Sequence, residues 1–195
     1  MSYYLAIDIG ASSGRHILGS IEDGKIKLEE IYRFENGISK IGDEYCWDIQ
    51  GLFNEIKKGI KKCKEIGKVP KTIGIDTWAV DFVLLDENDE MLGNVVAYRD
   101  DRTEGYMEKA FQVIPQDMLY LYTGIQFQRF NTLYQLLAIK DKNPEYLKKA
   151  KTFLMIPDYL NFLLTGKKAN EYTNATSTQL VNSFDRTWDK NILKE

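Results

Sequence analysis

The chain has 195 residues, of which 44% are hydrophobic and 28% charged, and a net charge of −3. This composition is typical of one globular domain, and the acidic balance gives no reason to expect a nucleic acid or an anionic membrane as partner. No apolar run approaches the roughly 18 residues that span a bilayer, and the N-terminus lacks the pattern of a signal peptide. Cys46 and Cys63 are too few for a disulfide framework or a zinc site, so we expect packing roles for both and a cytoplasmic protein.

The first third of the chain predicts three strands joined by short turns. Apolar and charged residues alternate along the runs YYLAIDIG, RHILGSIED and KIKLEEIYRF. In the third run, Ile26, Leu28 and Ile31 predict a strand with one buried and one wet face. The run WDIQGLFNEIKKGIKKCKEIG then predicts an amphipathic helix, with Asp48 as its N-terminal cap and Gly67 at its end.

The rest of the chain mixes strands with helices. After Pro70, the run that ends at Asp76 predicts a strand parallel to the first one, because a helical crossover returns to the same sheet. VDFVLLD and MLGNVVAY, separated by ENDE, predict a hairpin. From Thr103 onward the pattern is mostly helical, with KTFLMI as a short buried strand and Gly124 and Gly166 as helix C-terminal caps. Together these elements predict an α/β fold, a mixed β-sheet flanked by helices.

The turn DIGASSGR between the first two strands is a candidate anion site. We expect Gly10 and Gly14 to adopt backbone conformations closed to other residues, so that successive N–H groups point into one concavity. The turn has neither the P-loop pattern nor the dinucleotide-binding fingerprint, because it runs into a strand. A simple Gly/Ser turn is the alternative interpretation.

The residues around these glycines favour a ligand over a simple turn. Ser12 and Ser13 add hydroxyl donors, and Arg15 supplies a charged fork suited to phosphate. Asp8, at the end of the first strand, can hold Mg²⁺ through water. Donors, a guanidinium and a carboxylate are what a nucleoside triphosphate with its metal requires.

A second candidate follows the strand that ends at Asp76. If this strand lies beside the first, Asp76 ends close to Asp8, at the edge where open α/β sheets bind ligands. Trp78 offers a flat surface for a sugar and Asp81 a carboxylate for hydroxyls, whereas a turn with Trp78 in the core explains the pattern equally well. His16 is the only histidine and falls within a strand, so we expect it to be structural.

Several motifs together resemble the rhamnulokinase branch of the FGGY carbohydrate kinases. They include AIDIGASSGR, IGIDTWAVDFVLLD, VAYRDDRT, GIQFQRFNTLYQL, MIPDYLNFLLTGK and EYTNATSTQLVN, and the likeness runs over nearly the whole chain. It implies a ribonuclease-H-like, actin-like ATPase fold and the phosphorylation of L-rhamnulose to L-rhamnulose 1-phosphate by ATP. It also implies that Asp8 helps to hold Mg²⁺, and that five residues bind the ATP phosphates: Ala11, Ser12, Ser13, Gly14 and Arg15.

The same resemblance implies contacts to the sugar. The family usually has glycine where this chain has Ala79, at a position that contacts the substrate, so the added methyl group can narrow the site or reflect a variant ketose. Phe130 and Asn131 are also implied to line the sugar site, although Asn131 as a helix N-cap is an equal alternative. Three residues near Ala79 are secondary candidates: Asp76, Trp78 and Asp81.

The resemblance covers residues 1–195 as an incomplete N-terminal kinase domain. The family's general base is an aspartate that we expect beyond Glu195, so we expect no catalytic residue within this chain and no activity of the chain alone. Asp158 is expected to cap its helix. The alternatives are a ribonuclease-H-like two-metal nuclease and a non-catalytic sugar-binding or actin-like module. L-Fuculose and D-xylulose stay open as substrates, and the pattern predicts no oligomeric state.

Overall fold

The computed structural model describes residues 1–194 and divides the chain into two compact units. Unit 1 comprises Met1–Ser39 and Trp47–Trp78, and unit 2 comprises Lys40–Cys46 and Ala79–Glu195. None of the helices formed by residues 1–194 has the length and apolarity that crossing a bilayer requires.

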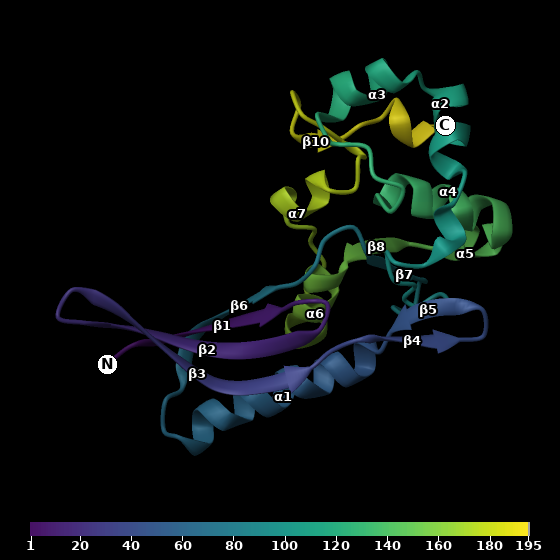
Figure 1. The fold of residues 1–195 in the computed structure, drawn as a ribbon. Helices are drawn as coiled ribbons and strands as arrows, with labels where there is room; N and C mark the ends of the chain where they lie inside the picture. Colours follow the sequence, from purple (N-terminus) through teal and green to yellow (C-terminus); the bar gives the residue numbers. More distant parts are fainter. Residues whose placement is uncertain (195) are drawn as a thin grey trace. The chain divides into compact units, whose positions relative to one another are not determined.

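Unit 1 is built on a four-stranded mixed sheet, in the order β3-β2-β1-β6 (Figure 1). The strands are β1 (Tyr3–Ile9), β2 (Ser13–Glu22), β3 (Lys25–Glu35) and β6 (Pro70–Asp76). β1, β2 and β3 form the predicted antiparallel meander, and β6 pairs in parallel with β1. Helix α1 (Ile49–Glu65) is the crossover that makes this parallel pairing possible. The prediction for this part of the fold is therefore confirmed.

Helix α1 packs its apolar side against the sheet. Asp48 caps the helix as predicted, because its Oδ1 accepts a hydrogen bond of 2.8 Å from the backbone N–H of Gly51. His16 on β2 is fully buried, and its Nε2 lies 3.2 Å from the carbonyl oxygen of Ile56. A Cβ on Gly59 would lie 2.3 Å from the His16 ring, so this glycine lets the helix approach β2. Burial lowers the pKa of His16, which supports the expected structural role of a neutral imidazole.

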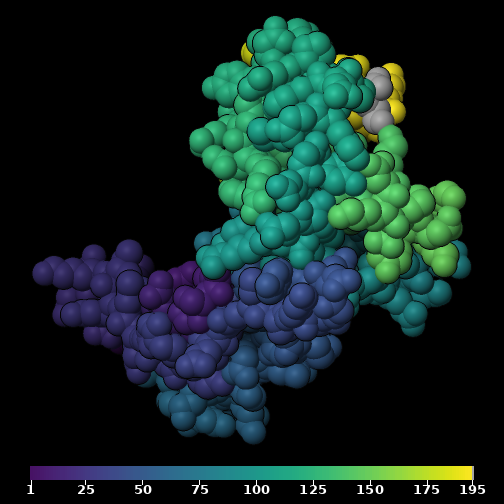
Figure 2. All heavy atoms as spheres, turned by 45° about the vertical axis from the view of Figure 1, so that its right-hand side comes forward, coloured from purple at the N-terminus to yellow at the C-terminus, as the bar shows by residue number. Residues whose placement is uncertain are grey.

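Strand β3 differs from its prediction at its first half. Ile26 and Leu28 are 75% and 71% exposed, so they do not form the buried face of the strand. The pairing of β3 with β2 skips Ile31, which is the extra residue of a β-bulge and shifts the alternation by one position. After the bulge, Phe34 is the buried residue and packs near the ring of His16. In Figure 2 no other part of unit 1 lies over the visible face of this hairpin, which is drawn in dark purple.

Unit 2 consists mainly of short helices around pairs of short strands. The helices are η1 (Asp101–Thr103), α2 (Tyr106–Val113), α3 (Gln116–Thr123), α4 (Thr132–Lys142), α5 (Pro144–Lys149), α6 (Ile156–Thr165), α7 (Tyr172–Thr176) and η2 (Ile192–Lys194). The strand pairs are β7 (Phe82–Leu85) with β8 (Thr152–Met155) and β9 (Val181–Asn182) with β10 (Thr187–Trp188). A further pair joins β4 (Ile38–Ile41) to β5 (Glu44–Trp47), and the boundary between the units falls within both strands.

The predicted hairpin after Val80 forms only at its turn, whereas the predicted helices are confirmed. Across the ENDE turn, Asp86 N–H donates to Glu90 O at 3.0 Å, Leu92 N–H donates to Leu84 O at 2.9 Å, and Leu85 bridges to Met91, but the main partner of β7 is β8, with which it pairs antiparallel. All four residues of β7 are buried, so the strand needs an apolar partner, and β8 supplies one. Gly124 and Gly166 end their helices with φ of 66° and 69°, as expected of C-terminal caps.

Asp158 does not cap α6, so this prediction is also wrong. The N-cap position belongs to Met155, because Pro157 occupies the first turn and the helix begins before the aspartate. Instead, Oδ1 of Asp158 accepts a hydrogen bond from the backbone N–H of Glu171, while Oδ2 is buried with no partner among the described residues.

Cys46 and Cys63 are free and buried, as expected of packing residues, and burial raises the pKa of both thiols.

Candidate functional site

The turn between β1 and β2 has a different geometry from the predicted one. Neither Gly10 nor Gly14 has a positive φ, so the expectation of unusual backbone conformations is wrong. Gly14 is required by packing, because a Cβ there would lie 2.1 Å from Cζ of Phe34. The turn is closed by the backbone N–H of Gly10, which donates to the carbonyl oxygen of Ser13 at 2.8 Å.

Asn36, which directly follows β3, fixes this turn by two hydrogen bonds. Its backbone N–H donates to Ser12 O at 3.0 Å, and its Nδ2 donates to Gly10 O at 2.8 Å. Within residues 1–194, the backbone N–H groups of Ala11 and Ser12 donate to no protein acceptor. These donors are therefore available to an anionic ligand. Sequence reasoning missed Asn36, although the Asn36–Gly37 dipeptide is a common turn signal.

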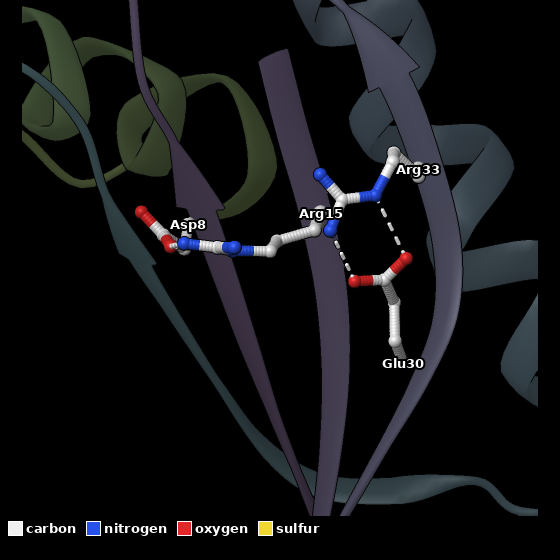
Figure 3. A network of polar contacts seen from close by, with 4 residues as sticks. All are labelled: Asp8, Arg15, Glu30 and Arg33. Carbon is white, nitrogen blue, oxygen red and sulfur yellow. Dashed lines mark hydrogen bonds and ion pairs between the residues drawn. The ribbon is translucent and has the colours of Figure 1, made fainter.

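Charged side chains form a row across the sheet next to the turn. In the strand register, Asp8 pairs with Asp76 on β6 and with Arg15 on β2, and Arg15 pairs with Arg33 on β3. Arg15 donates from Nε and Nη2 to Oδ2 of Asp8, at 2.8 and 2.7 Å. Arg33 makes a two-pronged contact with Glu30, at 2.9 and 2.6 Å, which lowers the pKa of this carboxyl. Figure 3 shows the four side chains from β1, β2 and β3 along one stretch of the sheet.

Asp8 and Asp76 could hold a divalent cation through water. Both contacts from Arg15 go to Oδ2 of Asp8, so Oδ1 accepts no hydrogen bond from the residues that the structure describes. In the same part of the chain, no three or more His, Cys, Asp and Glu side chains form a group that could bind a metal by themselves. Mg²⁺ usually keeps several waters and binds one or two carboxylates together with substrate phosphates, so Asp8 and Asp76 are candidates for such an ion.

Trp78 packs against a second tryptophan in unit 1. The ring centroids of Trp47 and Trp78 lie 3.9 Å apart, and the ring planes are tilted by 33°. Trp47 is buried and Trp78 half-buried, so part of the Trp78 ring serves packing. A stacking role toward a sugar stays a prediction.

The remaining sugar-site candidates belong to unit 2, where Ala79 begins a strained turn. The backbone N–H of Asp81 donates to Ala79 O at 2.9 Å, and Val80 between them has a φ of 66°. This is the pattern of a three-residue γ-turn with a left-handed central residue, which is rare and strained. Thr132, at the start of α4, donates from Oγ1 to Val80 O at 2.6 Å. Ala79 itself is exposed and accessible to a ligand.

Asp81 is fully buried, and both of its carboxylate oxygens accept hydrogen bonds within unit 2. Oδ2 accepts from the backbone N–H of Tyr98 at 3.0 Å, and Oδ1 accepts from Nε2 of Gln135 at 3.1 Å. The half-buried ring of Phe130 meets the ring of Tyr98 edge to face, with 5.6 Å between centroids. The backbone carbonyl of Phe130 accepts from the same Gln135 amide at 2.9 Å. Asp81 and the Phe130 backbone are thus brought together, although sequence reasoning gave no role to Gln135.

Asn131 occupies the N-cap position of α4 without capping it by its side chain. Its Nδ2 donates to Gln126 O at 2.9 Å and to Oε1 of Gln179 at 3.0 Å. The side chain therefore fixes the loop before α4, and its contact with a sugar stays a prediction.

Comparison with known proteins identifies the family of this chain. The sequence model of the FGGY family of carbohydrate kinases, N-terminal domain, matches residues 3–195. The rhamnulokinase of Halalkalibacterium halodurans is 61% identical over 194 residues, which are 100% of this chain and 41% of that protein. The rhamnulokinase of Oceanobacillus iheyensis is 58% identical, over 98% of this chain and 41% of that protein. The chain thus spans about two fifths of the length of these curated relatives.

Solved structures with low sequence identity share the fold. A ligand-bound xylulose kinase from Lactobacillus acidophilus has a TM-score of 0.88 at 22% identity, over 100% of this chain and 39% of that one. Glycerol kinase from Plasmodium falciparum, solved with ADP, has a TM-score of 0.75 at 21% identity, over 100% of this chain and 40% of that one. These matches confirm the predicted actin-like fold. The chain belongs to the FGGY family of carbohydrate kinases and matches the N-terminal domain of that family.

Proposed function

We propose that the complete protein is an L-rhamnulose kinase that transfers the γ-phosphoryl group of ATP to the ketose and forms L-rhamnulose 1-phosphate. The observation that carries this proposal is the 61% identity to a rhamnulokinase over the whole chain. Residues 1–195 form part of the N-terminal domain, and an aspartate beyond Glu195 supplies the general base. The two-metal nuclease is not favoured, because the family phosphorylates carbohydrates. As part of the same proposal, the protein works in the cytoplasm, where its buried thiols stay reduced.

For the nucleotide, the β1–β2 turn of unit 1 receives the ATP phosphates. The unpaired backbone N–H groups of Ala11 and Ser12 support this assignment, together with the Ser12 and Ser13 hydroxyls and the Arg15 guanidinium. Asp8, with Asp76 beside it, holds Mg²⁺ through water, and this ion when bound neutralises charge on the phosphates. Arg15 can leave Asp8 and bind phosphate with only a small loss of free energy, because the Arg15–Asp8 ion pair is half exposed.

For the sugar, exposed Ala79 of unit 2 is the main contact. Phe130 and Asn131 of the same unit form a second side of this site. Asp76 and Trp78 stay secondary candidates from the sequence. Asp81 acts by holding the backbone of the turn, since both of its carboxylate oxygens are already occupied. The methyl group of Ala79 makes the site narrower than one built on glycine, which favours a single ketose over larger sugars.

Product identification tests this function. The longest product of the gene would be incubated with ATP and L-rhamnulose, L-fuculose, D-xylulose or glycerol, and the products followed by phosphorus NMR. We expect a sugar 1-phosphate from L-rhamnulose, and slower or no product from the other three. Saturable ketose binding without any phosphorylated product would overturn the kinase proposal and favour the binding module.

A further inference from the structure

One buried amide in unit 2 connects both segments that we assign to the sugar. Gln135 on α4 is 1% exposed. Its Nε2 donates to Phe130 O at 2.9 Å, to Oδ1 of Asp81 at 3.1 Å and to Val80 O at 3.3 Å. Its Oε1 accepts from Nη2 of Arg102 at 2.7 Å. The orientation of the amide is unambiguous, since acceptors surround one end and a cationic donor meets the other.

The turn that Gln135 contacts needs to be held by its surroundings. Val80 is β-branched and has a φ of 66°, a conformation that such residues seldom adopt without support. Its carbonyl oxygen accepts from Thr132 and Gln135, and its N–H donates to Oγ of Ser177 at 3.3 Å. The turn therefore keeps Ala79 in place only while these partners remain.

We propose that Gln135 is a positioning residue of the sugar site, which fixes the spacing between the Ala79–Asp81 turn and the Phe130–Asn131 segment. This inference rests on the proposed kinase function. Removal of the amide leaves Asp81 and two backbone carbonyls without this donor and frees the two segments to separate. Because the ketose meets both segments at once, their separation weakens sugar binding. None of the hydrogen bonds of Gln135 described above reaches the β1–β2 turn, so we expect ATP binding to be unaffected.

The test is Gln135→Met in the full-length protein, because methionine keeps the volume and removes both hydrogen-bonding ends. We expect the KM for L-rhamnulose to rise about tenfold or more, as for loss of a buried hydrogen-bond network, while the KM for ATP stays within about twofold. Gln112→Met is the matched control, because Gln112 is exposed on α2 of the same unit. It should leave both constants unchanged.

Several outcomes would overturn the inference. Equal changes in both KM values, or an unchanged sugar KM beside a lower melting temperature, would show that Gln135 is only structural. If Gln135→Met does not fold, Thr132→Val is the second test, because it removes another donor to Val80 O at nearly constant side-chain volume. An unchanged KM for the sugar in this variant would refute the proposal. If the wild-type protein phosphorylates no ketose, the proposed function is refuted, and the inference that rests on it is refuted as well. An active wild type whose variants keep its sugar KM refutes the inference alone.

Discussion

Replacement of Gly14 by alanine is predicted to destabilise unit 1 through overlap with a buried ring. The added Cβ would lie 2.1 Å from Cζ of Phe34 and 2.6 Å from each of its Cε atoms. Phe34 is 8% exposed and packs near the rings of His16 and Tyr32, with centroids 6.1 and 6.2 Å away, so it has little room to move. Insertion of a methyl group into such packing costs about 1–3 kcal/mol of unfolding free energy.

Urea unfolding followed by far-UV circular dichroism measures this cost, with an unchanged m-value as evidence that only stability has changed. Gly74→Ala is the matched control in strand β6 of the same sheet, because a Cβ at Gly74 meets nothing within 4 Å. We expect this control to change the unfolding free energy by less than about 0.5 kcal/mol. The smaller side chain of Phe34→Leu should relieve the overlap, so a double-mutant cycle should give a coupling of about 1 kcal/mol or more.

A loss of less than about 0.5 kcal/mol in Gly14→Ala would refute the packing argument. Strictly additive effects of Gly14→Ala and Phe34→Leu would refute it as well. In either case Gly14 would be required for another reason than contact with Phe34.

Three further predictions concern the charged groups. Burial, with a smaller contribution from the charge of Glu171, raises the pKa of Asp158 to about 6, so ionisation destabilises the protein as the pH rises from about 4 through 6. Asp158→Asn should therefore raise the unfolding free energy by roughly 1–2 kcal/mol at pH 8 and hardly at all at pH 4, and an equal effect at both pH values would contradict this. Arg15→Gln should lower kcat/KM for ATP about tenfold or more, and unchanged kinetics would refute the phosphate role. The same change should lower the free energy of unfolding by less than about 1 kcal/mol, because the ion pair of Arg15 with Asp8 is half exposed. Asp48→Ala removes the N-cap of α1 and should cost about 1 kcal/mol in urea unfolding, and no loss would contradict the cap.

The fold of unit 1 was predictable because its signals are local. Alternating strands, a strongly amphipathic helix and its capping aspartate all lie within short windows of sequence. The bulge at Ile31 is also visible in the sequence, because the spacing from Ile26 and Leu28 to Ile31 breaks the alternation of apolar residues by one position. The partner of β7 was not predictable in this way, since β8 lies far along the chain and a nearby apolar run competes as a hairpin partner.

The candidate site was predictable only in part. The pairing of Asp8 with Asp76 followed from the parallel crossover, because that topology places both strand ends at one edge. The sequence predicted that position 14 needs glycine, but for its backbone conformation. The actual reason is the ring of Phe34, which comes from another strand and leaves no space for a side chain. Asn36 and Gln135 were missed because each acts through carbonyl oxygens of distant segments, and such contacts have no residue pattern in the sequence.

The most direct test of the account is ADP release by the full-length protein and by residues 1–195, measured side by side with ATP and L-rhamnulose. The account predicts ketose-dependent ADP release by the full-length protein and none by residues 1–195, because the general base is proposed to lie beyond them. Robust turnover by residues 1–195 would contradict the assignment of the base. Absence of ketose-dependent release by the full-length protein would contradict the kinase function itself.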